Sequence, residues 1–107
     1  MMNIKNWNIE AITDYKPITT FYMDFSIADK FGVNAIIDTF KRAFRSWKDN
    51  YKYLTELVMV LNWKIHEHYE KNNRYAQLYN NLWLELSNYA VENLKGEELS
   101  YYYNITD

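Results

Sequence analysis

The chain has two histidines, His66 and His68, in the stretch IHEHYE. Imidazole nitrogens bind transition metals and act as general acids or bases, so these residues are the first candidates for chemistry. Residues two apart on a helix point about 200° away from each other, so the pair cannot bind one ion from a shared face. His66 and Glu70 have the i, i+4 spacing that could bind one ion from a shared face, but two ligands are too few for a stable metal site. We therefore predict surface histidines near a helix end, with no metal and no cofactor.

Acidic side chains stand close together in the sequence at three places. The pairs are Glu67/Glu70, Glu97/Glu98 and Asp24/Asp29. Two carboxylates can divide the acid and base roles of a reaction when burial moves their pKa values apart, but we expect these on solvated helix faces. The chain also lacks cysteine, a glycine-rich phosphate loop and a nucleophile-elbow motif. We therefore expect no catalytic residue and no enzymatic activity.

Five basic residues recur at helical spacing in the middle of the chain. They form the candidate basic patch Lys41, Arg42, Arg45, Lys48 and Lys52. Most of them fall on one side of a helix, where they could contact a phosphate backbone or an acidic protein. A solvated charged face is the alternative. A helix-turn-helix is not expected, because the helix that follows is too long and too apolar to be a recognition helix.

Aromatic residues make up 19% of the chain, with eleven tyrosines and four tryptophans. Each buries a large area, and this is more aromatic surface than one small core is expected to absorb. Part of it falls beside the apolar stripes of the two longest expected helices. This candidate protein interface comprises Tyr51, Met59, Trp63, Tyr79 and Trp83. We predict that it contacts a partner protein or a second copy in a homodimer; the alternative is tyrosine tips that rim a wet surface.

The composition bounds the class of protein. With 107 residues, 49% of them hydrophobic, there is room for one domain with a real core. Only two glycines and one proline argue against disorder and against a turn-rich β-domain. A net charge of −2 gives no overall bias toward nucleic acid. There is no signal-peptide core and no apolar run long enough to span a bilayer, so we expect a soluble, cytoplasmic protein without membrane contact.

The spacing of apolar residues predicts an all-α fold, a compact bundle of about four helices with an N-terminal arm. In residues 51–95 the apolar positions recur every three or four residues, which is the helical period. The short polar break at 71–74 favours an antiparallel return. The expected helices are a short one at about 20–31, a medium one at about 34–48, and two long ones at about 51–71 and 74–95.

Local signals set the expected domain boundary. Pro17 breaks the helical pattern, so residues 1–18 are expected to form an arm, extended or weakly helical, and residues 19–107 a single helical domain. Ser26 and Asp29 have the spacing of a capping box, which would delay the regular part of the first helix until Ser26.

Asparagine and aspartate mark the later helix starts. Asn34 is the expected N-cap of the medium helix, and Asp49 or Asn50 that of the first long helix. Residues 97–107 could add one more helical turn or pack as an arm through their tyrosines, and the sequence leaves these two options open.

Four stretches resemble a group of small proteins, without an assigned activity, from phages and mobile elements of gut-type Firmicutes bacteria. They are DFSIADKFG (24–32), DTFKRAF (38–44), YKYLTELVMVLNWKI (51–65) and ENLKGEELSYYY (92–103). The resemblance covers most of the chain beyond about Ile12. It carries over no catalytic residue and no cofactor, and it implies an accessory or host-manipulating role.

Together these features predict a non-enzymatic protein that binds another protein through its aromatic surface. Two alternatives remain: a nucleic-acid-associated regulator that uses the basic patch, and a structural component of a virion. Binding through phosphate contacts weakens steeply as the salt concentration rises, whereas binding through an aromatic interface does not. The salt dependence of binding therefore separates the nucleic-acid regulator from the protein-binding protein.

Overall fold

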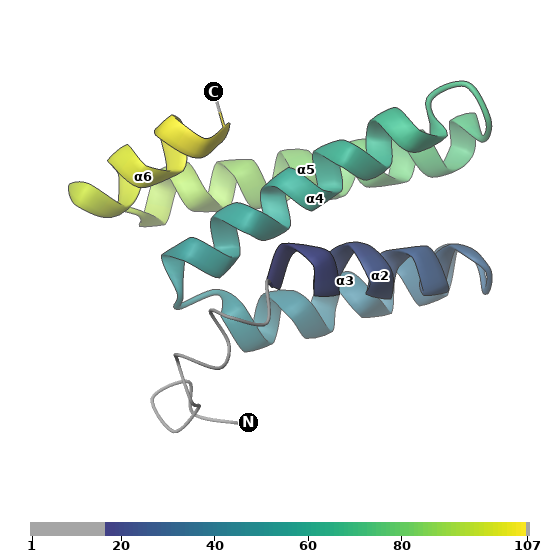
Figure 1. Ribbon diagram of the computed structural model, residues 1–107, viewed down its shortest axis with the longest axis horizontal. Helices are drawn as coiled ribbons and strands as arrows, with labels where there is room; N and C mark the ends of the chain where they lie inside the picture. The colour runs from purple at the N-terminus through teal and green to yellow at the C-terminus, as the bar shows by residue number, and fades with distance from the viewer. Residues whose placement is uncertain (1–16, 107) are drawn as a thin grey trace.

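The computed structural model describes residues 17–106, which form five α-helices and no strand (Figure 1). The helices are α2 (Pro17–Asp29), α3 (Val33–Trp47), α4 (Tyr51–His68), α5 (Asn73–Asn93) and α6 (Glu97–Thr106). The predicted all-α class is confirmed. The count of about four helices is too low by one, because the C-terminal residues form the helix α6.

Helix α4 is the central element, since it packs against each of the other four helices. Figure 1 shows α4 and α5 side by side as an antiparallel pair, with the α2–α3 hairpin along one side of α4. Helix α6 folds back over the end of the pair opposite the α4–α5 loop. The described part of the chain measures 37 × 25 × 22 Å.

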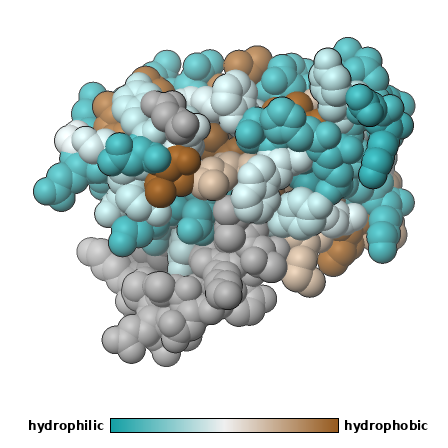
Figure 2. All heavy atoms as spheres, turned by 45° about the horizontal axis from the view of Figure 1, so that its top comes forward, coloured by the Kyte–Doolittle hydropathy of each residue, from teal (hydrophilic) through white to brown (hydrophobic). Residues whose placement is uncertain are grey.

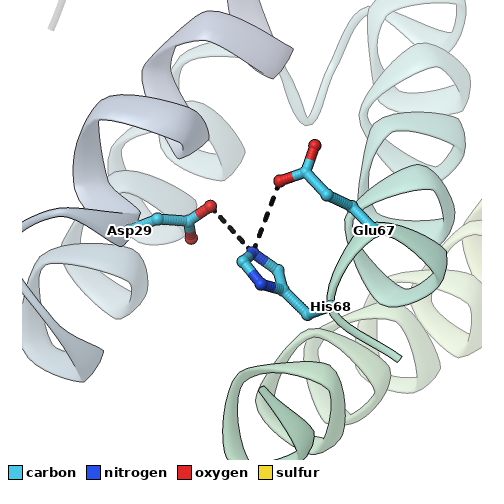
Figure 3. A group of neighbouring side chains, drawn as sticks. All are labelled: Asp29, Glu67 and His68. Carbon is cyan, nitrogen blue, oxygen red and sulfur yellow. Dashed lines mark hydrogen bonds and ion pairs between the residues drawn. The ribbon is translucent and has the colours of Figure 1, made fainter. Parts of the chain in front are cut away.

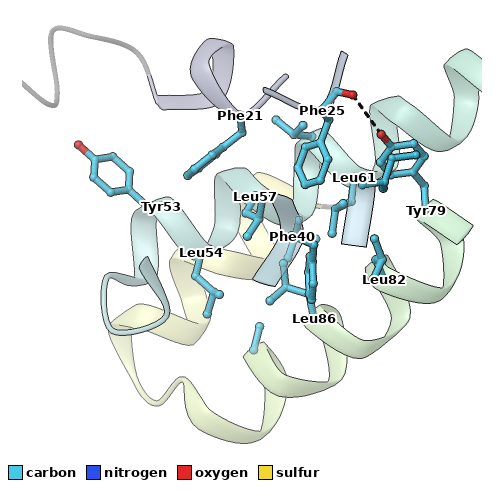
Figure 4. Close-up of a cluster of buried hydrophobic side chains, with 14 of the residues drawn as sticks. Phe21, Phe25, Phe40, Tyr53, Leu54, Leu57, Leu61, Tyr79, Leu82 and Leu86 are labelled. Atoms are coloured by element: carbon cyan, nitrogen blue, oxygen red, sulfur yellow. Dashed lines mark hydrogen bonds between the residues drawn. The ribbon is translucent and has the colours of Figure 1, made fainter. Parts of the chain in front are cut away.

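The core gathers where the α2–α3 hairpin meets the α4–α5 pair (Figure 4). Phe25 and Ile36 reach it from the hairpin and are completely buried. Helix α4 contributes most of the remainder, because it is apolar on more than one face. Its buried apolar residues are Tyr53, Leu54, Leu57, Val58, Val60 and Leu61.

Asparagine side chains start the two long helices. Asn50 Oδ1 accepts hydrogen bonds from the backbone N–H groups of Lys52 (3.1 Å) and Tyr53 (3.2 Å), which confirms it as an N-cap. At the start of α5, Asn72 Oδ1 accepts a hydrogen bond from the backbone N–H of Tyr75 at 3.2 Å. These bonds satisfy backbone donors that a helix leaves unpaired in its first turn.

Three of the expected helix boundaries are wrong. Helix α2 begins at Pro17 rather than after it, because proline suits the first helical position, where its missing N–H is not needed. Ser26 lies inside this helix and is not a cap. Helix α3 begins at Val33, so Asn34 is not its N-cap; Gly32 takes that position at a φ of +112° that strongly favours glycine.

The expected N-terminal arm falls almost entirely on residues 1–16, outside the described part of the chain. Within residues 17–106, no helix is both long and apolar enough to cross a bilayer.

Candidate functional site

A buried lysine, Lys64, lies at the centre of a polar cluster between α2, α4 and α5. Its side chain is completely buried. Its ammonium group lies 2.6 Å from Asp29 Oδ2, 2.5 Å from Glu67 Oε2 and 3.2 Å from Ser26 Oγ. An ammonium has three N–H donors, so these three acceptors satisfy it fully. We call these residues, together with Tyr22, His68, Tyr75 and Tyr79, the Lys64 cluster.

Asp29 is the second hub of the cluster. Its Oδ2 also lies 2.8 Å from His68 Nε2, and its Oδ1 accepts a hydrogen bond from the Tyr79 hydroxyl at 2.5 Å. Figure 3 shows the carboxylates of Asp29 and Glu67 directed at the same ring nitrogen of His68, with Glu67 Oε2 at 3.5 Å. Both carboxylates can accept a hydrogen bond from this nitrogen.

The tyrosines enclose the ionic groups. The hydroxyl of Tyr22 donates to Glu67 Oε1, and that of Tyr75 donates to the backbone carbonyl of Asp29 at 3.3 Å. The Tyr79 ring stacks parallel to the His68 ring, with centroids 5.6 Å apart. The Lys64 ammonium also lies 4.9 Å from the centroid of the Tyr22 ring, an attractive cation–π distance.

Helical spacing brings these residues together. Members three or four positions apart on each helix share a face, and the three faces converge on Lys64. The members are Tyr22, Ser26 and Asp29 on α2, Lys64, Glu67 and His68 on α4, and Tyr75 and Tyr79 on α5.

The electrostatics favour the charged forms of Lys64 and Glu67. Burial alone would lower the pKa of Lys64, but the hydrogen bonds and charges of Asp29 and Glu67 outweigh it and raise that pKa above its ordinary value. Burial opposes ionisation of Glu67 too, yet its bonds to Lys64 and Tyr22 leave its pKa lowered. Burial, followed by the bond to Asp29, raises the pKa of Tyr79. The contacts with Asp29 and Glu67 therefore favour the charged ammonium form of Lys64.

Asp29, Glu67 and His68 are also the one group among the described residues that could hold a metal ion, with ligand atoms within 4.8 Å of one another. However, the ammonium of Lys64 already lies against both carboxylates, in the place where a cation is stabilised. A metal ion would have to displace or tolerate that charge. The group is therefore better explained as an internal ion-pair network.

The structure corrects two predictions about these residues. His68 is largely buried and bonded to Asp29, so it is not a surface histidine, whereas His66 is exposed. Asp29 and Glu67 were expected on solvated faces, but both face Lys64. For Asp29 the prediction failed because its partners Lys64 and His68 stand more than 30 positions away on another helix, where sequence spacing carries no signal. Glu67 has Lys64 three residues away on α4, but the packing of α2 against this turn, which encloses the pair, is not visible in the spacing.

A second feature is a groove between α4, α5 and α6, with a volume of about 390 Å³. Within residues 17–106, no charged side chain lines it. The lining residues are Val58, Met59, Asn62, Trp63, Trp83, Ser87, Val91, Tyr102, Tyr103, Ile105 and Thr106. We call this the α4–α6 groove. Four of its large apolar side chains, Trp63, Val91, Tyr103 and Ile105, are each more than two fifths exposed. Figure 2 shows that hydrophobic atoms reach the surface at several separate places among hydrophilic ones.

The groove contains three of the five predicted interface residues, Met59, Trp63 and Trp83. Tyr79 was placed in this interface wrongly, because it is completely buried in the Lys64 cluster. Tyr51 lies outside the groove, where its ring meets that of Tyr101 edge to face at 5.3 Å. The wall that α6 adds was missed, because a short helix rich in tyrosine has no clear apolar stripe in the sequence.

The basic patch is present as a surface feature. Lys41, Arg42, Arg45, Lys48 and Lys52 are all exposed. Two exposed acids, Asp38 and Asp49, lie in the same stretch and reduce its positive charge.

Comparison with known proteins adds no relative: no protein-family model, no curated protein and no solved structure matches the chain. The resemblance to phage and mobile-element proteins thus stays a prediction.

Proposed function

We propose that this is a non-enzymatic binding protein that takes an amphipathic helix of a partner protein into the α4–α6 groove. The observation that carries the proposal is the exposure of Trp63, Val91, Tyr103 and Ile105 around one groove, in which none of the described lining residues is charged. Exposed aromatic and aliphatic residues gathered in a concave surface are typical of helix-in-groove recognition. Tryptophan and tyrosine are also the residues that dominate binding energy at protein interfaces.

The length of the groove and the charges on the helices around it describe its partner. Its α5 wall runs from Trp83 to Val91, which is about 12 Å, or roughly two helical turns. Helices α5 and α6 carry one basic residue, Arg74, against four acids, Glu85, Glu92, Glu97 and Glu98. A partner helix with two or three apolar anchors flanked by lysine or arginine would complement this surface.

The Lys64 cluster supports this function as a structural element. It ties α2 to the α4–α5 pair near the turn between the two long helices. The groove begins next to it on α4, because Trp63, which lines the groove, directly precedes Lys64. A fully satisfied buried network rigidifies the helices that form it. A rigid groove loses less entropy on binding than a mobile one.

Two matched variants test the proposal. Val91 and Leu84 are equally exposed, at 44%, and both lie on α5, but only Val91 lines the groove. In nuclease-treated lysate, the wild type and Leu84→Lys should capture the same stoichiometric partner, and Val91→Lys should lose it. The captured partner, purified, should bind the wild type directly. Equal capture by all three proteins would overturn the proposal.

A second candidate function is binding of nucleic acid through the basic patch, which the exposure of all five residues favours. Phosphate contacts release counterions, so affinity would fall steeply between low and physiological salt. Charge reversal at Arg42 and Arg45 would abolish such binding and leave groove binding intact. A role within a phage or mobile element is compatible with either candidate.

A further inference from the structure

A second hollow lies beside the α4–α6 groove, between α2 and α4. Its volume is about 560 Å³, and its lining residues are Tyr22, Trp63, His66 and Glu67. Trp63 also lines the groove, so the two cavities adjoin each other. The ring of Tyr22 meets that of Trp63 edge to face, with centroids 6.3 Å apart and planes inclined by 65°. Two aromatic rings and one carboxylate therefore border this cavity, which we call the Tyr22–Glu67 hollow.

We propose that the Tyr22–Glu67 hollow binds an arginine side chain of the partner whose helix occupies the α4–α6 groove. This inference rests on the proposed function for the identity of the chain that carries the arginine. A guanidinium is planar and weakly hydrated, so it can lie against an aromatic ring while its N–H groups donate to a carboxylate. The hollow offers both kinds of contact, the rings of Tyr22 and Trp63 and the carboxylate of Glu67.

The charges next to the hollow favour a cation. The carboxylates of Asp29 and Glu67 share the single ammonium of Lys64, so with His68 neutral the Lys64 cluster carries one negative charge in excess. Lys64 is completely buried and is not a lining residue of the hollow. Glu67 does line it, and its side chain is 30% exposed against 13% for Asp29. Glu67 is thus the carboxylate that a cation from solvent can approach.

Glu67 also keeps acceptor capacity for another donor. Its Oε2 lies 2.5 Å from the Lys64 ammonium and 3.5 Å from His68 Nε2, and its Oε1 accepts the Tyr22 hydroxyl. An ionised carboxylate has about four acceptor sites, so at least one remains for a guanidinium N–H. A metal ion would need several converging ligands, whereas a guanidinium requires only the exposed side of this one carboxylate.

One row of residues along α4 connects the groove to the hollow. Met59, Trp63 and Glu67 stand four residues apart, so they follow one another on the same face of the helix. Met59 and Trp63 line the groove, and Trp63 and Glu67 line the hollow. Glu67 is about 6 Å, or one helical turn, beyond Trp63. The partner helix should therefore carry its arginine about one turn away from the apolar side chain that contacts Trp63.

The isolated side chain provides the first test. Nα-acetyl-arginine amide is titrated into nitrogen-15-labelled protein, with Nα-acetyl-citrulline amide, its uncharged isostere, as the control. The indole N–H signal of Trp63 should shift with millimolar arginine compound and stay with citrulline, because only the guanidinium is charged. The signals of Trp83, which lines the groove but not the hollow, and of Trp47 should stay in both titrations. No shift of Trp63, or an equal shift with citrulline, would overturn the proposal.

Charge changes at His66 give a second test, because this exposed residue lines the hollow without belonging to the Lys64 cluster. At a mildly alkaline pH, where histidine is neutral, His66→Lys should weaken binding of the arginine compound about threefold, and His66→Glu should strengthen it by a similar factor. Asn88→Lys, which adds the same charge at an exposed position on α5 outside both cavities, should leave it unchanged.

The captured partner, purified, should follow the same order of affinities. A partner that is lost by Val91→Lys but binds equally to wild type, His66→Lys and His66→Glu would contradict the arginine site and leave the proposed function of the groove intact. A partner that is insensitive to Val91→Lys would instead contradict the proposed function, and with it the link between groove and hollow.

Discussion

The ammonium of Lys64 lies 2.6 Å from Asp29 Oδ2, and this ion pair joins the last turn of α2 to α4 inside the protein. The lysine side chain is completely shielded from solvent, and the carboxylate is nearly so. A buried charge is costly unless it is paired and hydrogen-bonded, so each partner depends on the other. Stability should therefore respond strongly to changes at either residue.

Replacing the lysine should be among the most damaging single substitutions. Lys64→Met keeps an apolar stem but leaves Asp29 and Glu67 without their cation, and removal of one buried ion-pair partner costs about 3–5 kcal/mol. Lys71→Met, at an exposed position, should cost almost nothing. Urea unfolding of the three proteins measures the difference. Equal stability of the two variants would show that the ion pair contributes little.

The hydroxyl of Tyr79 should also contribute measurably. Tyr79→Phe removes the donor to Asp29 Oδ1 while keeping the buried ring, and an unsatisfied buried partner costs about 1–3 kcal/mol. Tyr69→Phe is the control, because Tyr69 is among the most exposed hydrophobic residues described. Thermal unfolding should show a clear decrease in Tm for the first variant only.

The folded protein should lose stability in acid. The pKa of Glu67 is lowered by its bonds to Lys64 and Tyr22 despite the opposing effect of burial, so the folded state binds its proton more weakly than the unfolded state. The contribution of Glu67 is therefore present above its ordinary pKa of 4.5 and is lost as the pH falls through the lowered folded value. Denaturation curves below pH 4.5 should show the loss, and Glu67→Gln should reduce this part of the pH dependence.

The folded protein should also lose stability at high pH, because of Lys64. The pKa of Lys64 is raised above 10.5, because the bonds to Asp29 and Glu67 outweigh the effect of burial. Its contribution is complete below pH 10.5 and is lost as the pH rises through the raised folded value. Lys64→Met should remove this contribution to alkaline unfolding; an unchanged alkaline transition in the variant would contradict it.

The N-cap of the central helix gives a further test. Asn50→Ala removes the acceptor for the Lys52 and Tyr53 N–H groups, which typically costs about 1 kcal/mol. Asn80→Ala, exposed within α5, should have no comparable effect. Chemical denaturation distinguishes the two, and a similar loss in both would mean that the cap is not the cause.

The long helices could be predicted from the sequence because their signals are local. Apolar spacing located α4 and α5, and Asn50 indicated where α4 begins. The same kind of local reasoning failed at Ser26 and Asp29. Their three-residue spacing fits a capping box, but in the structure both side chains bond to Lys64 on another helix.

The burial of Tyr79 and the groove wall formed by α6 also depend on tertiary packing, which the sequence spacing does not show. Tyr79 was expected on the surface because it follows Leu78, which belongs to the apparent stripe of α5. In the structure Tyr79 is buried and Leu78 is only partly so, since the α2–α3 hairpin covers that side of the helix. The groove wall formed by α6 depends on the packing of this short helix against the core, where Tyr102 is buried and Leu99 partly so.

The binding of a partner in the α4–α6 groove can be tested most directly through the tryptophan side chains. In a nitrogen-15 spectrum each indole N–H gives its own signal, and Trp63 and Trp83 line the groove whereas Trp47, on α3, does not. On addition of the purified captured partner, the Trp63 and Trp83 signals should shift and the Trp47 signal should stay. If the signals of Trp63 and Trp83 stay unchanged while amides of α3 shift, the partner binds elsewhere and the groove is not the binding site.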